Sequence, residues 1–251
     1  PLCGHATLAS LLALGHWGLI EEREEVRFHS RSGPLAARLE PGGGARRGSI
    51  DLPSGRMRSA LMPAALETLL ERSGLGAALG YWTSPLGYVV ALLDPKAPLD
   101  TVRSLAAELE EAPRQGLVLM QAQPSPAEAV ANPALVAGQP VDYRLRFFAP
   151  GLGIPEDPVT GSAHALVAPW WQERCGRSRV VGWQCSDRPG GVVCEGLPSG
   201  KIRLFGSGHL LWDGTLHTQT REPHGAGSAA GQEASATGYP RCGWSVLRVS
   251  D

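Results

Sequence analysis

The sequence lacks any charge bias, since 23 Lys and Arg stand against 24 Asp and Glu in 251 residues, for a net charge of -1. A surface that binds nucleic acid needs a basic excess to neutralise phosphates, so nucleic acid is excluded as the main partner. The sequence also lacks an apolar run close to the roughly 18 residues of a membrane span. We therefore expect no membrane partner.

Cysteine is scarce and unpatterned: the five cysteines are an odd number and form no CxxC pair. This argues against a disulfide framework or a structural zinc site and favours a reducing compartment, which predicts a cytoplasmic protein. No metal is assigned, because no histidine has ligand spacing with a carboxylate. A GxxxxGK[ST] motif and a strand-linked GxGxxG are also missing, which excludes a kinase or dinucleotide-binding reading.

The hydrophobic fraction, 43%, is ordinary for a globular chain, whereas Gly (32) and Pro (21) are abundant. Part of that excess lies in residues 218–251, which have no apolar period and are expected to be disordered. Elsewhere the patterns predict a mixture of helices and strands. Helices are expected at 6–19 (apolar nearly all round, hence buried), 63–72, 99–109 and 163–173. Strands are expected at 26–30, 35–39, 49–52, 86–93, 117–121, 143–148, 180–184, 191–195, 202–205 and 208–212.

An internal repeat stands out against this background. The segment PLCGHA at 1–6 aligns without gaps with PVTGSA at 158–163, and each is followed by an apolar helix pattern. The first N–H groups of a helix have no internal partner, and the helix dipole makes that end positive. Two such ends facing one cleft would bind a small anion, most naturally a carboxylate.

Ordinary structural readings of the same residues stay open. Thr160 and Ser162 are good N-cap types, Asp157 suits a cap or a turn, and Cys3 suits a small buried position. His5 is as well explained by a satisfied core histidine as by a site. The pairing of two turns, one with an imidazole and one near a carboxylate, favours a site for acid/base chemistry.

The two turns, PLCGHATLAS at 1–10 and EDPVTGSAHAL at 156–166, resemble the signature turns of the phenazine biosynthesis PhzF-like family, especially its animal members. RFFAP at 146–150, WQCSDRPGG at 183–191 and KIRLFGSGHLLWDGTL at 201–216 fit the same family. The likeness covers roughly residues 1–217.

This resemblance implies an α+β fold like that of diaminopimelate epimerase, with two similar domains. Each domain is a curled sheet around a central helix, and the site lies between them. We expect a first domain at 1–58 that lacks its N-terminal strands, a second at 59–217 and a tail at 218–251. Because a sheet without its first strands exposes unpaired edges, residues 1–58 are expected to fold poorly. The family also suggests a homodimer.

The family resemblance also implies the site. Its members move a proton on a small carboxylic acid without cofactor or metal, using a Glu, a His, an Asp and a Ser. His5, Asp157 and Ser162 match the last three as catalytic residues, and substrate-binding positions are the remaining residues of the turns: Cys3, Gly4, Thr160 and Gly161. The Glu belongs to a stretch resembling NLSET upstream of the first turn, where this sequence begins at Pro1.

The leading prediction is thus a cofactor-independent isomerase acting on a small carboxylate, impaired in this chain by the absent Glu. The alternative is a non-catalytic binding protein that keeps the fold and the anion cleft. A two-thiol racemase using Cys3 is a weaker third reading. Thr160 stands where the second thiol would be, and Cys175 lies about four helical turns further on.

Overall fold

A single large sheet organises the chain in the computed structural model, which describes residues 4–30, 33–42, 46–124 and 135–214. Twelve strands form this sheet in the order β1-β2-β3-β14-β13-β12-β10-β7-β6-β5-β4, with β11 paired to β10, and a separate two-stranded hairpin joins β8 to β9. The strands are β1 (Glu25–Ser30), β2 (Gly33–Glu40), β3 (Arg46–Pro53), β4 (Arg58–Ser59), β5 (Gly80–Thr83), β6 (Val89–Leu92), β7 (Leu117–Ala122), β8 (Leu135–Val136), β9 (Gln139–Pro140), β10 (Tyr143–Ala149), β11 (Ile154–Glu156), β12 (Arg179–Gln184), β13 (Gly190–Gly196) and β14 (Lys201–Gly208).

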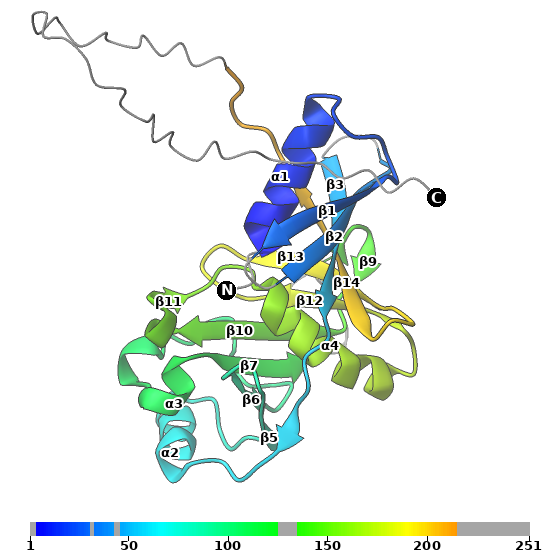
Figure 1. Ribbon diagram of the computed structural model, residues 1–251. Coiled ribbons are helices and arrows are strands. Elements are labelled where there is room, and N and C mark those ends of the chain that lie inside the picture. Colours follow the sequence, from blue (N-terminus) through cyan, green and yellow to red (C-terminus); the bar gives the residue numbers. More distant parts are fainter. Residues whose placement is uncertain (1–3, 31–32, 43–45, 125–134, 215–251) are drawn as a thin grey trace, which may run out of the picture.

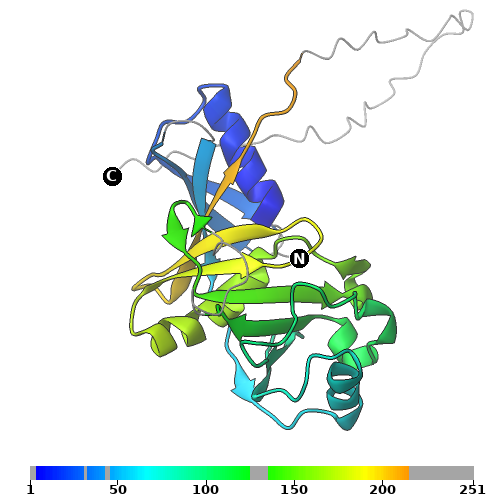
Figure 2. The same cartoon turned by 180° about the vertical axis from the view of Figure 1, so that it is seen from behind.

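Helices are few and lie against this curled sheet (Figures 1 and 2). In Figure 1, α1 lies at the top over β1 to β3, α4 runs through the centre, and α2 and α3 lie at the far end beside β5 to β7. The helices are α1 (Gly4–His16), α2 (Ala64–Arg72), α3 (Glu111–Arg114) and α4 (Gly161–Cys175), with 3-10 turns η1 (Ala106–Glu108) and η2 (Pro150–Leu152). The mixed α+β fold with a curled sheet is as predicted.

The internal repeat appears as a pseudo-two-fold arrangement. α1 precedes β1, β2 and β3, α4 precedes β12, β13 and β14, and these six strands run through the sheet as β1-β2-β3-β14-β13-β12. The third strands of the two copies, β3 and β14, pair antiparallel over eight residues, from Arg46↔Gly208 to Pro53↔Lys201. The repeat read from six residues is therefore a structural repeat.

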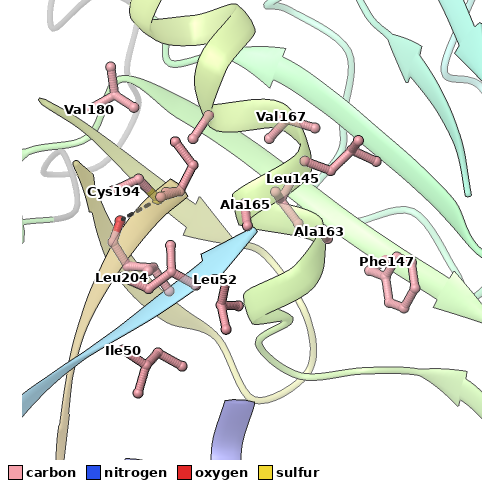
Figure 3. Packing of buried hydrophobic residues seen from close by; sticks show 14 of the residues in the cluster. Ile50, Leu52, Leu145, Phe147, Ala163, Ala165, Val167, Val180, Cys194 and Leu204 are labelled. Carbon is pink, nitrogen blue, oxygen red and sulfur yellow. Dashed lines mark hydrogen bonds between the residues drawn. The ribbon is translucent and has the colours of Figure 1, made fainter. Parts of the chain in front are cut away.

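The core is centred on α4, which the sheet encloses. Ala163, Ala165 and Val167 of α4 lie between Leu145 and Phe147 of β10 on one side and residues of β3 and β14 on the other (Figure 3). Small side chains along α4 let the strands approach the helix closely. This is the central helix that the resemblance implies.

A proline inside α4 is accommodated by the chain that links the two halves. Pro169 has no N–H to donate to the carbonyl of Ala165, four residues earlier. The backbone N–H of Gly55 donates to that carbonyl instead, at 3.3 Å. A Cβ on Gly55 would lie 2.3 Å from Leu166 Cδ1, so glycine is needed for this close approach. The linker after β3 is thereby fixed against the second helix.

α1 is less enclosed than its sequence predicts. Only Thr7, Leu11 and Leu12 are buried, on the face that contacts β2, β3 and β14, whereas His5 and Ala6 are exposed. The prediction of a helix buried all round is therefore wrong for α1, because the described strands cover one face alone. Residues 4–30, 33–42 and 46–58 nevertheless form regular elements. β14 pairs with the edge of β3 over eight residues, and the expected poor folding of residues 1–58 stays a prediction.

The predicted helix at 99–109 is also wrong. Leu99, Leu105 and Leu109 are buried in a second cluster with α2, which explains their helix-like spacing. However, the buried guanidinium of Arg146 donates to the backbone carbonyls of Leu99 and Val102, and these carbonyls would be acceptors within a helix. The segment consequently forms turns and the short η1.

The remaining differences concern strands. The predicted strand at 86–93 is confined to β6, and β5 before it was not predicted. The segment 208–212 forms no strand beyond Gly208, and Leu211 and Trp212 are exposed. β3 and β14 are neighbours in one continuous sheet, which joins the two expected domains. The expected domain boundary at residues 58 and 59 stays a prediction. The tail at 218–251 lies outside the described residues.

Candidate functional site

Both helices of the repeat begin at the glycine of their turn, and both beginnings lie at one cavity. Within the described residues α1 starts at Gly4, and α4 starts at Gly161, each two residues before the predicted start. The cavity has a volume of about 350 Å³ and is open to solvent. We call it the helix-end cavity, and its lining includes Gly4, His5, Leu8, Ile50, Val159, Gly161, Gly190, Gly191, Val192, Leu204, Phe205, Gly206 and Ser207.

The two turns are placed equivalently on the sheet. A Cβ on Gly4 would lie 3.3 Å from Ile50 Cδ1, and a Cβ on Gly161 would lie 3.3 Å from Leu204 Cδ1. Ile50 and Leu204 are themselves partners in the pairing of β3 with β14. The pseudo-two-fold relation therefore extends to the site, and it brings two helix N-termini to one place.

The electrostatics of the two helix ends favour an anion. Neither α1 nor α4 has an acidic residue in its first turn, and the carboxylate next to the start of α4, that of Asp157, is engaged by Thr160 Oγ1. At α4 the N–H of Thr160 donates to Gln184 Oε1 at 2.7 Å, whereas the N–H groups of Gly161 and Ser162 have no acceptor among the described residues. These two donors can bind a carboxylate oxygen.

Hydrogen bonds hold the second turn rigidly. Asp157 Oδ2 accepts a hydrogen bond from Thr160 Oγ1 at 2.7 Å, and the Asp157 N–H donates to the Phe147 carbonyl at 3.1 Å. Thr160 is the N-cap residue of α4, but its side chain makes no capping bond. Asp157 is thus engaged within the turn, and it is not among the residues lining the helix-end cavity.

The other predicted residues divide between the cavity and its surroundings. His5 is exposed and lines the helix-end cavity together with Gly4 and Gly161. Ser162 lies outside the lining, and its Oγ is 3.2 Å from Tyr88 Oη. Cys3 lies outside the described residues. Three of the predicted residues, Gly4, His5 and Gly161, therefore line the cavity together. Asp157, Thr160 and Ser162 lie in the second turn but outside the lining.

Sequence reasoning missed Gln184 and Tyr88. Gln184 is fully buried at the end of β12. Its Oε1 accepts from Thr160 N–H, and its Nε2 donates to the Asp157 carbonyl and to Thr160 Oγ1. The sequence did carry a signal for Gln184, which is the glutamine at the end of the apolar run Val-Val-Gly-Trp-Gln. A side-chain amide that is buried at the end of such a strand needs hydrogen-bond partners nearby.

Next to the site, on the same helix, a buried histidine is held neutral. His164 Nδ1 lies 2.9 Å from Tyr143 Oη, and the Tyr143 ring stacks on Trp171 with centroids 5.2 Å apart. Burial lowers the pKa of His164 from 6.5 to about 3. His164 is closed off from solvent and belongs to the core rather than to the cavity.

The described residues contain no group of three or more His, Cys, Asp or Glu side chains that could hold a metal ion. None of the helices in the described part of the chain has both the length and the apolar character to cross a membrane.

Comparison with known proteins agrees with this geometry. Residues 1–195 match the PhzC-PhzF family, described as phenazine biosynthesis-like protein. The chain belongs to the PhzF family. An isomerase of Pseudomonas aeruginosa, named as uncharacterized, is 35% identical over 216 residues, covering 86% of this chain and 73% of that protein. The human phenazine biosynthesis-like domain-containing protein is 30% identical over 230 residues, with the same two coverages.

Solved structures of PhzF proteins share the fold. A PhzF-family protein of Enterococcus faecalis has a TM-score of 0.64 and 26% identity, over 82% of this chain and 69% of that one. A PhzC/PhzF protein of Clostridium difficile has a TM-score of 0.68 and 24% identity, over 86% and 74% respectively. The predicted PhzF, diaminopimelate epimerase-like fold is thereby confirmed.

Proposed function

We propose that this PhzF-family chain binds a small carboxylate at the helix-end cavity and catalyses its isomerisation by proton transfer, without a cofactor. One observation carries the proposal: His5, Gly4 and Gly161, from two turns far apart in sequence, line the same cavity. Two relatives from Pseudomonas aeruginosa are named isomerases, which supports the reaction class.

The proposed chemistry assigns a different task to each part of the site. The ends of α1 and α4 stabilise negative charge on the carboxylate and on the anion formed when a neighbouring carbon loses its proton. Such preorganised donors contribute about 3–4 kcal/mol each in enzymes where they have been removed. The His5 imidazole reaches the cavity, where it accepts the proton from this carbon and returns it to a second carbon of the substrate.

The remaining predicted residues act from behind the cavity in this proposal. Ser162 contributes its backbone N–H to the carboxylate site together with that of Gly161, and its Oγ lies 3.2 Å from Tyr88 Oη. Asp157 fixes the second turn through Thr160. A small carboxylate is thus the proposed partner, and the substrate's identity is left to the experiment.

Solvent isotope exchange tests the proposal. A panel of small amino and hydroxy acids is incubated with the protein in D2O, and deuterium uptake next to the carboxylate is followed by NMR. We expect uptake for at least one acid and a loss of at least tenfold in His5→Gln. The matched control is His29→Gln, at an exposed position on β1, which should exchange normally. Exchange that is unchanged in His5→Gln would remove His5 from the mechanism.

A second candidate is a non-catalytic carboxylate-binding protein with the same cleft. One observation favours it: no Asp or Glu lines the helix-end cavity in the described part of the chain. The two candidates differ in one readout. With a small acid, the melting temperature of a binding protein rises, but the acid takes up no deuterium. With an isomerase, the melting temperature rises and the acid also takes up deuterium.

A further inference from the structure

The large sheet opens between β13 and β14 next to the helix ends. These strands pair only from Val193↔Phe205 to Gly196↔Ile202. Beyond Val193, β13 continues to Gly190 paired with β12 alone, and beyond Phe205, β14 continues to Gly208 paired with β3 alone. The two strands therefore separate beside the helix-end cavity.

A second cavity adjoins the helix-end cavity at this opening. We call it the outer chamber, and its volume is about 410 Å³. Gly191, Phe205, Gly206 and Ser207 line both cavities, so the two spaces meet at the separated strands. The hairpin of β8 and β9 borders the outer chamber through Val136, Ala137 and Gln139, and Figure 2 shows this hairpin (green) beside the yellow strands.

Close packing at the opening requires a glycine. A Cβ on Gly191 would lie 2.0 Å from Val136 Cγ2, so any side chain there would displace the hairpin that borders the chamber. On the other strand, a Cβ on Gly206 would lie 2.8 Å from Leu8 Cδ2 of α1. Where the two cavities meet, two of the four shared lining residues are therefore glycines, and the other two are Phe205 and Ser207.

The outer chamber carries two guanidinium groups. Arg47 lines it and has no ion-pair partner among the described residues. Its register partner Glu40 also lines the chamber, but the Glu40 carboxylate accepts a hydrogen bond from the buried Ser49 hydroxyl at 2.5 Å. Arg47 thus lines the chamber beside the Glu40 carboxylate without an ion pair among the described residues, and its guanidinium can bind an external anion.

The second guanidinium is positioned by an aromatic ring. Arg179 lies over Phe205, 4.7 Å from the ring centroid, and its ion pair with Glu195 is long, at 3.6 Å, between side chains that are more than a third exposed. Such an exposed pair contributes little, so a ligand carboxylate can compete for Arg179. Guanidinium groups bind carboxylates with paired hydrogen bonds, which gives this chamber a preference for an acidic group.

We propose that the helix-end cavity and the outer chamber form one binding site for an elongated dianion. One carboxylate lies at the N-termini of α1 and α4, and a second acidic group lies at Arg47 and Arg179. This inference rests on the proposed function for its first half and adds the substrate class, an acid with two anionic ends. The separation of β13 from β14 provides the passage that the ligand spans.

The test uses straight-chain α,ω-dicarboxylates from succinate to sebacate, each compared by calorimetry with the monocarboxylate of equal carbon number. We expect one chain length to bind at least tenfold more tightly than its monocarboxylate. Arg47→Gln and Arg179→Gln should each remove most of that advantage and leave monocarboxylate affinity within about twofold. Arg58→Gln, an exposed arginine on β4 at the far edge of the sheet, should change neither affinity.

The outcomes separate this inference from the proposed function. Equal affinity for mono- and dicarboxylates, or a dicarboxylate advantage that survives both arginine substitutions, overturns the dianion site. Deuterium exchange on a monocarboxylate would then still support the isomerase. Dicarboxylates that bind without competing against a monocarboxylate would show two separate sites and would also overturn the inference. Failure of every acid to bind overturns both.

Discussion

At the scale of single residues, Gln184 does most to hold the second turn in place. It is fully buried and satisfies the Thr160 N–H, the Asp157 carbonyl and the Thr160 hydroxyl. A buried polar group that loses its partner costs about 1–3 kcal/mol. We expect Gln184→Leu to lower the free energy of unfolding by about 2–3 kcal/mol, measured by urea denaturation.

The matched control for that substitution is Gln172→Leu on α4. The Gln172 amide makes one hydrogen bond, to the Ser178 carbonyl at 2.7 Å, in an exposed position. Water can replace that bond, so the loss should stay below about 1 kcal/mol. Equal losses in the two variants would contradict the role given to Gln184.

His164 makes stability depend on pH. Burial lowers its pKa from 6.5 to about 3, so between these values the unfolded chain binds a proton that the folded chain does not. The free energy of unfolding contributed by this group is therefore complete above pH 6.5 and falls as the pH drops towards 3, by up to about 1.4 kcal/mol per pH unit.

Two measurements check this prediction. Urea denaturation at several pH values between 7.5 and 4 should show the acid-side fall. NMR of the imidazole in the folded protein should show no titration of His164 between pH 5 and 8. An imidazole that titrates near 6.5 would mean that the ring is hydrated, contrary to its packing against Tyr143 and Trp171.

At the scale of elements, the pairing of β3 with β14 joins the two copies of the repeat. Asp51 of β3 is buried and is the register partner of Arg203 on β14. Its carboxylate accepts from Arg203 Nε at 2.6 Å and from Nη2 at 2.9 Å. The hydrogen bonds to Asp51 are the main cause of the raised pKa of Arg203, so the guanidinium stays charged.

We expect this pair to show a coupling energy above about 1 kcal/mol in a double-mutant cycle of Asp51→Ala and Arg203→Ala, measured by urea unfolding. The pair Arg179 and Glu195 joins β12 to β13 and is the control, because it is longer and more exposed. Its coupling should stay below about 0.5 kcal/mol. Equal couplings would remove the special role of Asp51.

Local patterns predicted most elements, and the exceptions have tertiary causes. β7, β10 and β12 were recognised because buried strands are rich in branched and aromatic residues. The segment 99–109 was mistaken for a helix because apolar spacing does not reveal that Arg146, far along the chain, binds its carbonyls.

The site was predictable to the extent that it is carried by a local motif. The glycine turns placed the starts of α1 and α4 to within two residues, and the resemblance implied His5 and Asp157. A shared cleft was expected from the repeat, but the residues that line it could not be read from the sequence, because they depend on the antiparallel pairing of β3 with β14. The position of Asp157 outside the cavity lining could not be read from the sequence either. It depends on Gln184, which lies in a strand that follows α4 and donates to the Asp157 carbonyl.

At the scale of the whole molecule, the position of a strand in the continuous sheet determines how stable that strand is against local opening. β3 is hydrogen-bonded on both sides, by β2 and β14, whereas β1 is an edge strand within the described part of the sheet. Amide hydrogens in central strands exchange through the larger unfolding events, and those at an edge exchange through local opening. The sheet therefore predicts a gradient of protection from β3 outward to β1.

Hydrogen exchange followed by NMR on the full chain measures this gradient. We expect amides of β3 to exchange about as slowly as those of β13, and amides of β1 to exchange much faster. β7, which lies between β10 and β6, serves as the internal reference for a central strand. Fast exchange throughout β3 with slow exchange in β7 would mean that the first copy of the repeat is unfolded in solution. The helix-end cavity would then lack one of its two helices, so the same measurement decides whether this chain can form the proposed site.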